Sequence, residues 1–176
     1  IPYQSAVLPL ERSPAIASGF FVSAPENPMK PVQKIAALGL AAALSLVATW
    51  EGVRTTAYRD VIGIPTICYG YTHGVQMGDT ATPDECRDLL VQELLTVYAS
   101  VRQCIDVRLT EGQRAAVVSL AYNAGTGAVC KSTFVRKLNA RDPSACDELR
   151  RWVYAGGKYH QGLATRREAE RKACIG

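Results

Sequence analysis

Three side chains near residue 50 have the types and the spacing that hydrolysis of a polar bond would need. Glu51 ends a long apolar run, Asp60 follows after eight residues, and Thr66 follows after five more. Cleavage of a glycosidic bond by direct water attack requires one carboxylic acid that protonates the leaving oxygen and one carboxylate that activates the water. The spacing is therefore compatible with an acid–base pair assisted by a hydroxyl.

The surroundings of these residues suggest which catalytic role each would have. Glu51 follows apolar residues, and such a setting disfavours the charged carboxylate by desolvation. Asp60 follows a polar turn, where a carboxylate is easily solvated, and the Thr66 hydroxyl could orient the water. On residue types alone, a helix-end acid and a turn acid that only solvate a surface are the more common explanation.

The composition limits the class of protein. The chain has 176 residues and a mass of 19.0 kDa, enough for one domain with a core. Hydrophobic residues make up 48%, which excludes disorder throughout. The net charge of +4 fits a partner with negative charge, such as nucleic acid, anionic lipid or bacterial cell wall. Basic residues do not interleave with aromatic ones, so we expect no nucleic-acid partner, and we expect a monomer.

Six cysteines suggest covalent cross-links. No C-x-x-C pair occurs, and neither His73 nor His160 lies at metal-ligand spacing from a cysteine, so we expect no metal site. An even number favours disulfides in an oxidising compartment over buried free thiols in the cytosol. Proximity along the chain favours the pairs Cys68–Cys86, Cys104–Cys130 and Cys146–Cys174.

The chain divides into an irregular proline-rich arm at residues 1–34, an apolar segment at 35–50, and a domain at 51–176. The apolar segment has no charge, and as a single helix it would be about 24 Å long, short of the roughly 30 Å hydrocarbon core. Its insertion would be marginal. A cleaved signal peptide, a buried core helix and a weak membrane anchor all remain open. A catalytic Glu51 would need a rigid element before it, which favours retention of the segment over cleavage.

Beyond residue 50 the pattern is mostly helical. Residues 61–74 are β-branched and aromatic, broken by glycine and proline, and predict a small hairpin or ribbon. Capping patterns predict helix starts at Thr82, Thr110, Asp142 and Thr165, with helix stops at Gly125 and at Gly156. We therefore expect an α+β fold that is predominantly helical.

The pattern E-x8-D-x5-T resembles the catalytic signature of the phage-type lysozymes, glycoside hydrolase family twenty-four. Two later segments, "SLAYNAGTGAVCKSTFVRKLNARD" and "CDELRRWVYAGGKYHQGLATRREAERKAC", are also similar to that family. The three motifs keep the family's order, and the resemblance covers about residues 35–175. It implies a lysozyme-like fold with a small β-hairpin or ribbon near the catalytic cleft.

The resemblance also implies a reaction. Glu51 would be the general acid, Asp60 the carboxylate that positions or activates the water, and Thr66 its helper. The bond would be the β-1,4 link from N-acetylmuramic acid to N-acetylglucosamine in peptidoglycan, cleaved without metal or cofactor and with inversion.

Further residues match family positions that line or support the cleft: Asn123, Gly125, Ser132 and Thr133. Asn123 and Gly125 could equally end a helix. Family members commonly have Gly-His-Thr-Gly after the threonine strand, whereas this chain has Tyr71 and a displaced His73, and we assign neither a chemical role. Four arginines could bind the anionic wall, or lie on solvated faces, or pair with Glu168 and Glu170: Arg150, Arg151, Arg166 and Arg167.

The apolar segment resembles that of the signal-arrest-release endolysins of lambdoid phages. Residues 35–50 would first tether an inactive enzyme in the inner membrane and later leave it, which would place the active protein in the periplasm of an infected bacterium. Alternatives are a secreted endolysin with a cleaved signal peptide, a non-catalytic wall-binding module on a membrane tether, and a membrane-perturbing peptide.

Overall fold

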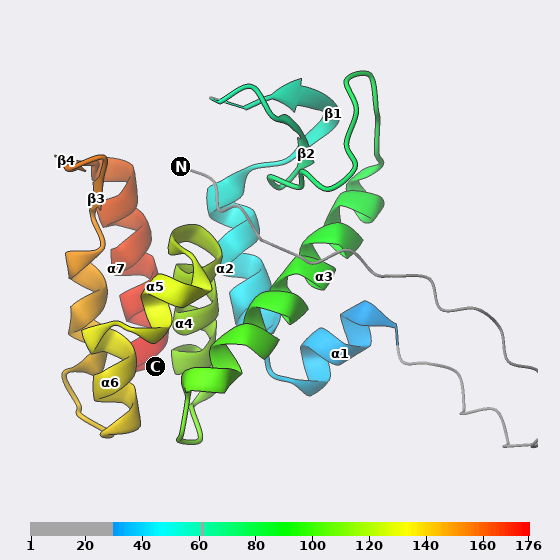
Figure 1. Cartoon of the computed structure of the whole chain (residues 1–176). Coiled ribbons are helices and arrows are strands. Elements are labelled where there is room, and N and C mark those ends of the chain that lie inside the picture. The colour runs from blue at the N-terminus through cyan, green and yellow to red at the C-terminus, as the bar shows by residue number, and fades with distance from the viewer. Residues whose placement is uncertain (1–29, 61) are drawn as a thin grey trace, which may run out of the picture.

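Helices dominate the computed structural model, which describes residues 30–60 and 62–176 (Figure 1). Within these residues the α-helices are α1 (Pro31–Ala37), α2 (Ala41–Glu51), α3 (Pro83–Val101), α4 (Glu111–Ala124), α5 (Thr126–Cys130), α6 (Thr133–Asn139) and α7 (Gln161–Ile175). The 3-10 helices are η1 (Arg102–Cys104) and η2 (Ala145–Arg151), and the strands are β1 (Arg54–Arg59), β2 (Pro65–Cys68), β3 (Tyr154–Ala155) and β4 (Lys158–Tyr159). The expected α+β fold, predominantly helical with small β-hairpins, is confirmed.

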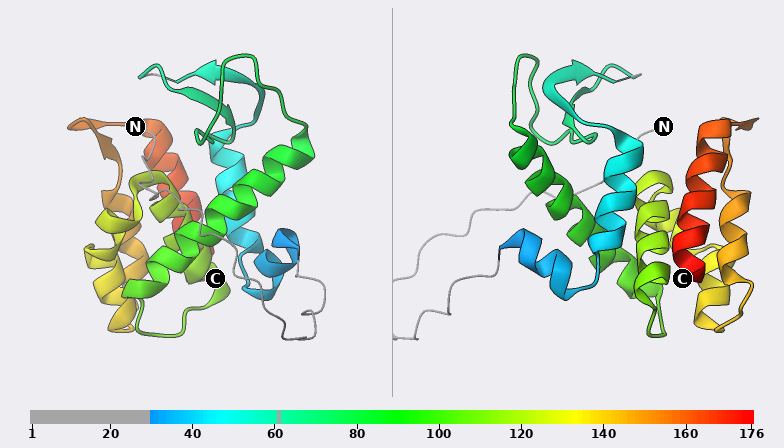
Figure 2. Two further views of the ribbon diagram at one scale, coloured as in Figure 1. Left: turned by 45° about the vertical axis from the view of Figure 1, so that its right-hand side comes forward. Right: turned by 180° about the vertical axis from the view of Figure 1, so that it is seen from behind.

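Helix α4 forms the centre of the core. Every residue from Ala115 to Ala121 is buried, and a helix that is buried on all sides must be covered by neighbours on all sides. Helices α2, α3 and α7 pack against it, and Figure 2 shows α4 between α2 and α7. Helix α4 therefore fixes the position of α2 relative to α7.

The apolar segment is not the single helix that the sequence predicted. Helix α1 ends at Ala37, α2 begins at Ala41, and the two are bent by 117°. Gly39 at the break has a φ of +61°, a conformation that glycine adopts without strain. The Arg114 guanidinium donates hydrogen bonds to the carbonyls of Leu38 and Gly39, so α4 satisfies acceptors that a continuous helix would pair internally.

Both short helices contribute to the core, through Ile35, Ala43 and Val47, and Leu40 between them is also fully buried. Because α1 begins at Pro31, the end of the expected irregular arm is helical, while residues 1–29 lie outside the described residues. In the described part of the chain, no single helix is long and apolar enough to cross a membrane. Helices α1 and α2 meet that test only together, as a bent pair, and only by length and composition.

Strands β1 and β2 form the hairpin that carries Asp60 and Thr66. They pair antiparallel, with Tyr58 opposite Thr66. The sequence predicted a β element at residues 61–74, which β2 confirms, but β1 lies before that range. In β1 only Ala57 is buried, so the strand has no alternation of apolar residues that would have revealed it.

Two predicted helix starts are confirmed with their capping boxes. The Thr82 hydroxyl accepts a hydrogen bond from the Glu85 backbone N–H at the start of α3. At the start of α4, Thr110 and Gln113 form the same reciprocal pair. These short-range hydrogen bonds depend only on neighbouring residues, which is why the sequence could reveal them.

The two later helix starts are wrong. The segment after Asp142 is the 3-10 helix η2, which begins at Ala145, and the predicted stop at Gly156 is the turn of the β3–β4 hairpin. Thr165 lies inside α7, where its hydroxyl donates to the carbonyl of Gln161 instead of capping. A threonine followed three residues later by a glutamate also occurs within helices, where the hydroxyl bonds to the preceding turn.

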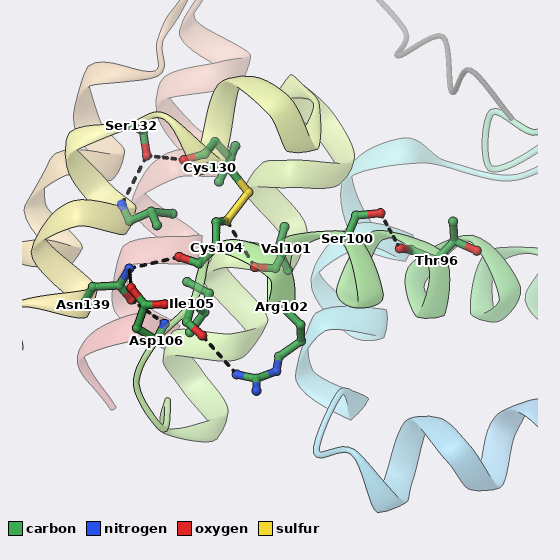
Figure 3. The surroundings of a disulfide bond; sticks show 12 residues. Thr96, Ser100, Val101, Arg102, Cys104, Ile105, Asp106, Cys130, Ser132 and Asn139 are labelled. Atoms are coloured by element: carbon green, nitrogen blue, oxygen red, sulfur yellow. Dashed lines mark hydrogen bonds between the residues drawn. A yellow bond between two sulfur atoms is a disulfide. The ribbon is translucent and has the colours of Figure 1, made fainter.

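All three predicted disulfides are confirmed, and no described cysteine is free. Cys68–Cys86 joins β2 to α3, Cys104–Cys130 joins η1 to α5 (Figure 3), and Cys146–Cys174 joins η2 to α7. They close loops with sequence separations of 18, 26 and 28 residues. Each would stabilise the fold by about 3 kcal/mol on the chain-entropy model.

Candidate active site

Glu51 is the last residue of α2 and lines a cavity of about 410 Å³. The cavity is lined by Trp50, Glu51, Asn123, His160, Gln161, Gly162, Leu163 and Arg166. The Glu51 side chain is 25% exposed, and its Oε1 accepts a hydrogen bond of 2.7 Å from Nη1 of Arg166. The end of α2, the end of α4 and the start of α7 thus meet at one acid.

The apolar setting that the sequence predicted for Glu51 is wrong. The apolar residues before it face the core, but the carboxylate itself forms an ion pair with Arg166, which lies 115 residues further along the chain. Nothing in the sequence around residue 50 could reveal this partner.

A buried ion network continues behind Arg166. Arg166 donates from Nε to Glu170 at 3.2 Å, and Arg167 lies 2.8 Å from the same carboxylate. Ser119 of α4 donates its hydroxyl to Glu170 at 2.6 Å. Burial raises the pKa of Glu170 and lowers the pKa of Arg167 to about 10, against the attraction between the two groups. The interpretation of Arg166 and Arg167 as partners of Glu170 is thus confirmed, and neither is a surface residue.

The other two arginines remain on the surface. Arg150 pairs with Glu168 at 3.1 Å, as one interpretation expected, and Arg151 pairs with Glu148 at 3.3 Å. Their side chains are 55% and 74% exposed. Hydrogen bonds from arginine and lysine hold the pKa values of Glu168 and Glu148 below the usual range.

Asp60 lies in the turn between β1 and β2, where it is half-buried instead of freely solvated. Its Oδ1 accepts backbone hydrogen bonds from Ile62 at 3.0 Å and Ile64 at 2.8 Å. Its Oδ2 is buried and has no hydrogen-bond partner among the described residues. Native structures rarely leave such an atom unpaired.

Thr66 is buried, at 3% exposure, and is linked to Asp60 through Ile64. The Thr66 hydroxyl donates to the Ile64 carbonyl at 2.9 Å, while the Ile64 N–H donates to Asp60. Because the single hydroxyl proton is used in this way, Thr66 can only accept a hydrogen bond from a water.

Of the four residues expected in the cleft, only Asn123 lines the cavity with Glu51. Gly125, with a φ of +91°, ends α4 and precedes α5. Ser132 caps α6: its hydroxyl accepts from the Val135 N–H and donates to the Val129 carbonyl (Figure 3). Thr133 is the first residue of α6. Gly125, Ser132 and Thr133 therefore lie at the ends of helices, where one helix follows another along the chain.

Sequence reasoning missed several residues around Glu51. His160, Gln161 and Gly162 line the cavity from the start of α7, although the family resemblance already extended through this segment. Tyr122 of α4 donates its hydroxyl to the Tyr69 carbonyl at 3.0 Å. Burial foremost, and then the charge of Glu51, raises the pKa of Tyr122. A tyrosine inside a helical apolar pattern carries no signal of such a location.

The two residues that depart from the family pattern, Tyr71 and His73, do not line this cavity. Tyr71 and His73 contact each other edge-on, with ring centroids 5.4 Å apart, and His73 lies 4.0 Å from Glu93 of α3. In the described residues, no group of three or more His, Cys, Asp or Glu side chains could hold a metal ion.

Known proteins resemble this chain in sequence and in fold. The family model for phage lysozyme matches residues 48–170. The SAR-endolysin of bacteriophage PS119 is 47% identical over 127 residues, which are 71% of this chain and 76% of that protein. A crystal structure of a P22 lysozyme variant is 32% identical, covers 77% of this chain and 97% of its own, and superposes with a TM-score of 0.72.

A further solved pair compares two states of one fold. The active form of the P1 phage endolysin Lyz has a TM-score of 0.71 with this chain at 22% identity, covering 82% of this chain and 91% of its own. The secreted inactive form has a TM-score of 0.52 at 20% identity, covering 77% and 94%. The family model spans more than half of the chain and includes Glu51, Asp60 and Thr66. The chain therefore belongs to the phage lysozyme family and is a hydrolase of the lysozyme class.

Proposed function

We propose that the chain hydrolyses the β-1,4 bond from N-acetylmuramic acid to N-acetylglucosamine in peptidoglycan, with Glu51 as acid and Asp60 as base. The observation that carries this assignment is the Asp60 carboxylate, whose Oδ1 is fixed by two backbone N–H groups in the turn of the hairpin that also carries Thr66. Such a group is held rigidly, as a catalytic carboxylate must be. Glu51 supplies the second carboxyl, in a cavity with Asn123.

In the proposed reaction, the protonated carboxyl of Glu51 gives its proton to the glycosidic oxygen as the bond to the anomeric carbon breaks. Asp60 takes a proton from a water as the water oxygen attacks that carbon from the opposite face, which inverts its configuration. Thr66 accepts a hydrogen bond from the same water. The step consumes one water and leaves Glu51 ionised and Asp60 protonated, and exchange with solvent restores both.

Arg166 has a defined part in this scheme. Once Glu51 has given up its proton, the guanidinium at 2.7 Å stabilises the resulting carboxylate.

The test compares clearing of purified peptidoglycan by the wild-type chain and by Glu51→Gln, followed by analysis of the sugar ends. We expect reducing N-acetylmuramic acid ends from the wild type and none from a folded Glu51→Gln variant. The matched control is Glu168→Gln, the same change at a half-buried position on α7 that does not line the cavity. Equal clearing by all three chains, with the same sugar ends, would exclude Glu51 as the acid.

We further propose that residues 35–50 control activity by leaving the inner membrane. Ile35, Leu40, Ala43 and Val47 are buried against the domain in the folded chain. In a membrane-inserted state these contacts would be absent, and Glu51 could not reach Arg166. Retention of the segment as part of the core favours this mechanism over a cleaved signal peptide, since cleavage would remove those core residues.

Replacement of residues 35–50 by a strongly apolar helix that cannot leave the bilayer tests this control. We expect the replaced chain to leave infected cells intact, while the natural chain lyses them when the membrane potential is collapsed. Both should be compared on isolated wall, where the natural chain needs no release. Lysis by the permanently anchored chain, equal to that of the natural chain, excludes the mechanism.

A further inference from the structure

Behind Glu51 lies a buried network of two arginines and one glutamate, which together carry one excess positive charge. Arg166 and Arg167 are 4% and 1% exposed, and Glu170, the carboxylate between them, is completely buried. Two guanidinium groups therefore share one interior carboxylate. The excess positive charge is directed at Glu51, which accepts from Nη1 of Arg166 while Nε of the same guanidinium donates to Glu170.

The two carboxylates compete for Arg166. One guanidinium cannot approach both anions more closely at once, so a stronger contact with Glu170 weakens its contact with Glu51. Glu170 is itself held by a 2.6 Å hydrogen bond from the Ser119 hydroxyl and by the ion pair with Arg167. These partners therefore influence how strongly Glu170 attracts Arg166.

We propose that Glu170 is a positioning residue for the reaction: it holds Arg166 in place, takes up part of its charge, and so sets how strongly Arg166 pairs with Glu51. Glu170 does not line the cavity and acts only through Arg166. This inference rests on the proposed role of Glu51 as the acid.

Other groups around Glu51 define the background for any pH effect. Arg167 and Glu170 of α7 stand behind Arg166, Tyr122 of α4 and Glu93 of α3 interact electrostatically near the acid, and His160 lines the cavity. None of these other groups forms a hydrogen bond to both Arg166 and Ser119, as Glu170 does. A change at Glu170 therefore acts on Glu51 through Arg166 and its link to Ser119, a set of contacts that the other groups do not make.

Glu170→Gln tests the proposal because it removes the charge and keeps an oxygen that can accept from Ser119. Arg166 then acts on Glu51 alone, the Glu51 carboxylate is stabilised, and the acid loses its proton at lower pH. We expect the alkaline limb of the activity–pH profile to move down by about 0.5 to 1 pH unit. Glu168→Gln, two residues away on α7 and paired with Arg150 instead of Arg166, should leave that limb in place.

Ser119→Ala acts in the same direction but keeps the carboxyl group of Glu170. Without the hydroxyl, the buried Glu170 is less well stabilised as a charged carboxylate, Arg166 acts more strongly on Glu51, and the alkaline limb should move to lower pH by less than in Glu170→Gln. A purely structural role for the network would lower activity at every pH without moving either limb. If Glu170→Gln does not fold, the direction of the Ser119→Ala shift decides alone.

Carbon-13 NMR titration of the Glu51 carboxyl separates this inference from the proposed function. We expect its midpoint to move down in Glu170→Gln and, by less, in Ser119→Ala. If the NMR midpoint moves while the activity profile does not, Glu51 is not the acid, and the proposed function fails. If Glu51→Gln is inactive but neither variant moves the NMR midpoint, the proposed function stands and the positioning role of Glu170 is wrong.

Discussion

Glu51 is held by a residue 115 positions further along the chain, whereas Asp60 is held by backbone N–H groups at most four residues away. The Glu51 side consists of charged groups at the meeting point of α2, α4 and α7. The Asp60 side is one hairpin turn, in which Ile64 connects Asp60 to Thr66. The first depends on the whole fold, and the second depends mainly on local hydrogen bonds.

The two arrangements differ in what disturbs them. A long-range ion network fails when any helix shifts, because an unpaired charge in the interior is costly. A turn held by neighbouring backbone groups tolerates such shifts as long as the hairpin persists. We therefore expect mutations on the Glu51 side to affect folding and pH dependence, and mutations on the Asp60 side to affect activity more than stability.

The largest effect is expected from Arg166→Met, which removes the partner of both Glu51 and Glu170. Loss of one member of a buried ion pair should lower the free energy of unfolding by about 3–5 kcal/mol. Urea unfolding measures this change. The control is Arg150→Met, since the Arg150 side chain is 55% exposed and its ion pairs should contribute no more than about 1 kcal/mol. Equal losses in the two variants would contradict the difference between buried and surface pairs.

Asp60→Asn should abolish most activity and leave the fold intact. The asparagine carbonyl can still accept from Ile62 and Ile64, but the side chain can no longer take a proton, so the rate should fall by about 10²–10⁴-fold. Asp79→Asn is the matched control, because Asp79 also accepts a backbone hydrogen bond in a turn, from Gln76. Initial rates on peptidoglycan, with circular dichroism for folding, measure both. Full activity in Asp60→Asn would exclude its role as base.

Removal of single disulfides should show whether the Asp60 hairpin and the helices around Glu51 unfold independently. Replacing Cys68 and Cys86 by alanine releases β2 from α3 and should cost about 3 kcal/mol on the chain-entropy model, with faster hydrogen exchange at Ala57 and Ile64. The counterpart, with Cys146 and Cys174 replaced, releases η2 from α7 and should instead affect exchange in α7. The same exchange pattern in both variants would mean that the regions unfold as one unit.

The smallest effect is expected from Thr66→Val. The variant loses the hydroxyl that donates to the Ile64 carbonyl, which should cost about 1 kcal/mol. Thr66→Ser keeps the hydroxyl and serves as the control for both stability and rate. If Thr66→Val retains the wild-type rate on peptidoglycan, then Thr66 only supports the turn and does not assist the water.

Short-range patterns were the part of the fold that could be predicted. The capping boxes at Thr82 and Thr110 and the disulfide Cys68–Cys86 were found because their partners are near in sequence. Prediction failed where a local pattern had another use: Thr165 bonds back along its own helix, and the turn after η2 belongs to a hairpin. The break at Gly39 was missed because Arg114, which binds the carbonyls there, comes 75 residues later.

The sequence by itself determined the three candidate residues Glu51, Asp60 and Thr66, the cysteine pairs and the predominance of helices. These depend on residue types and on spacing along the chain. Only the tertiary structure decided what surrounds Glu51. The carboxylate that apolar neighbours seemed to isolate is paired with Arg166, because packing of α2 and α7 against α4 brings together charges that the chain keeps far apart. Electrostatic environment follows distance in space, and spacing along the chain does not fix that distance.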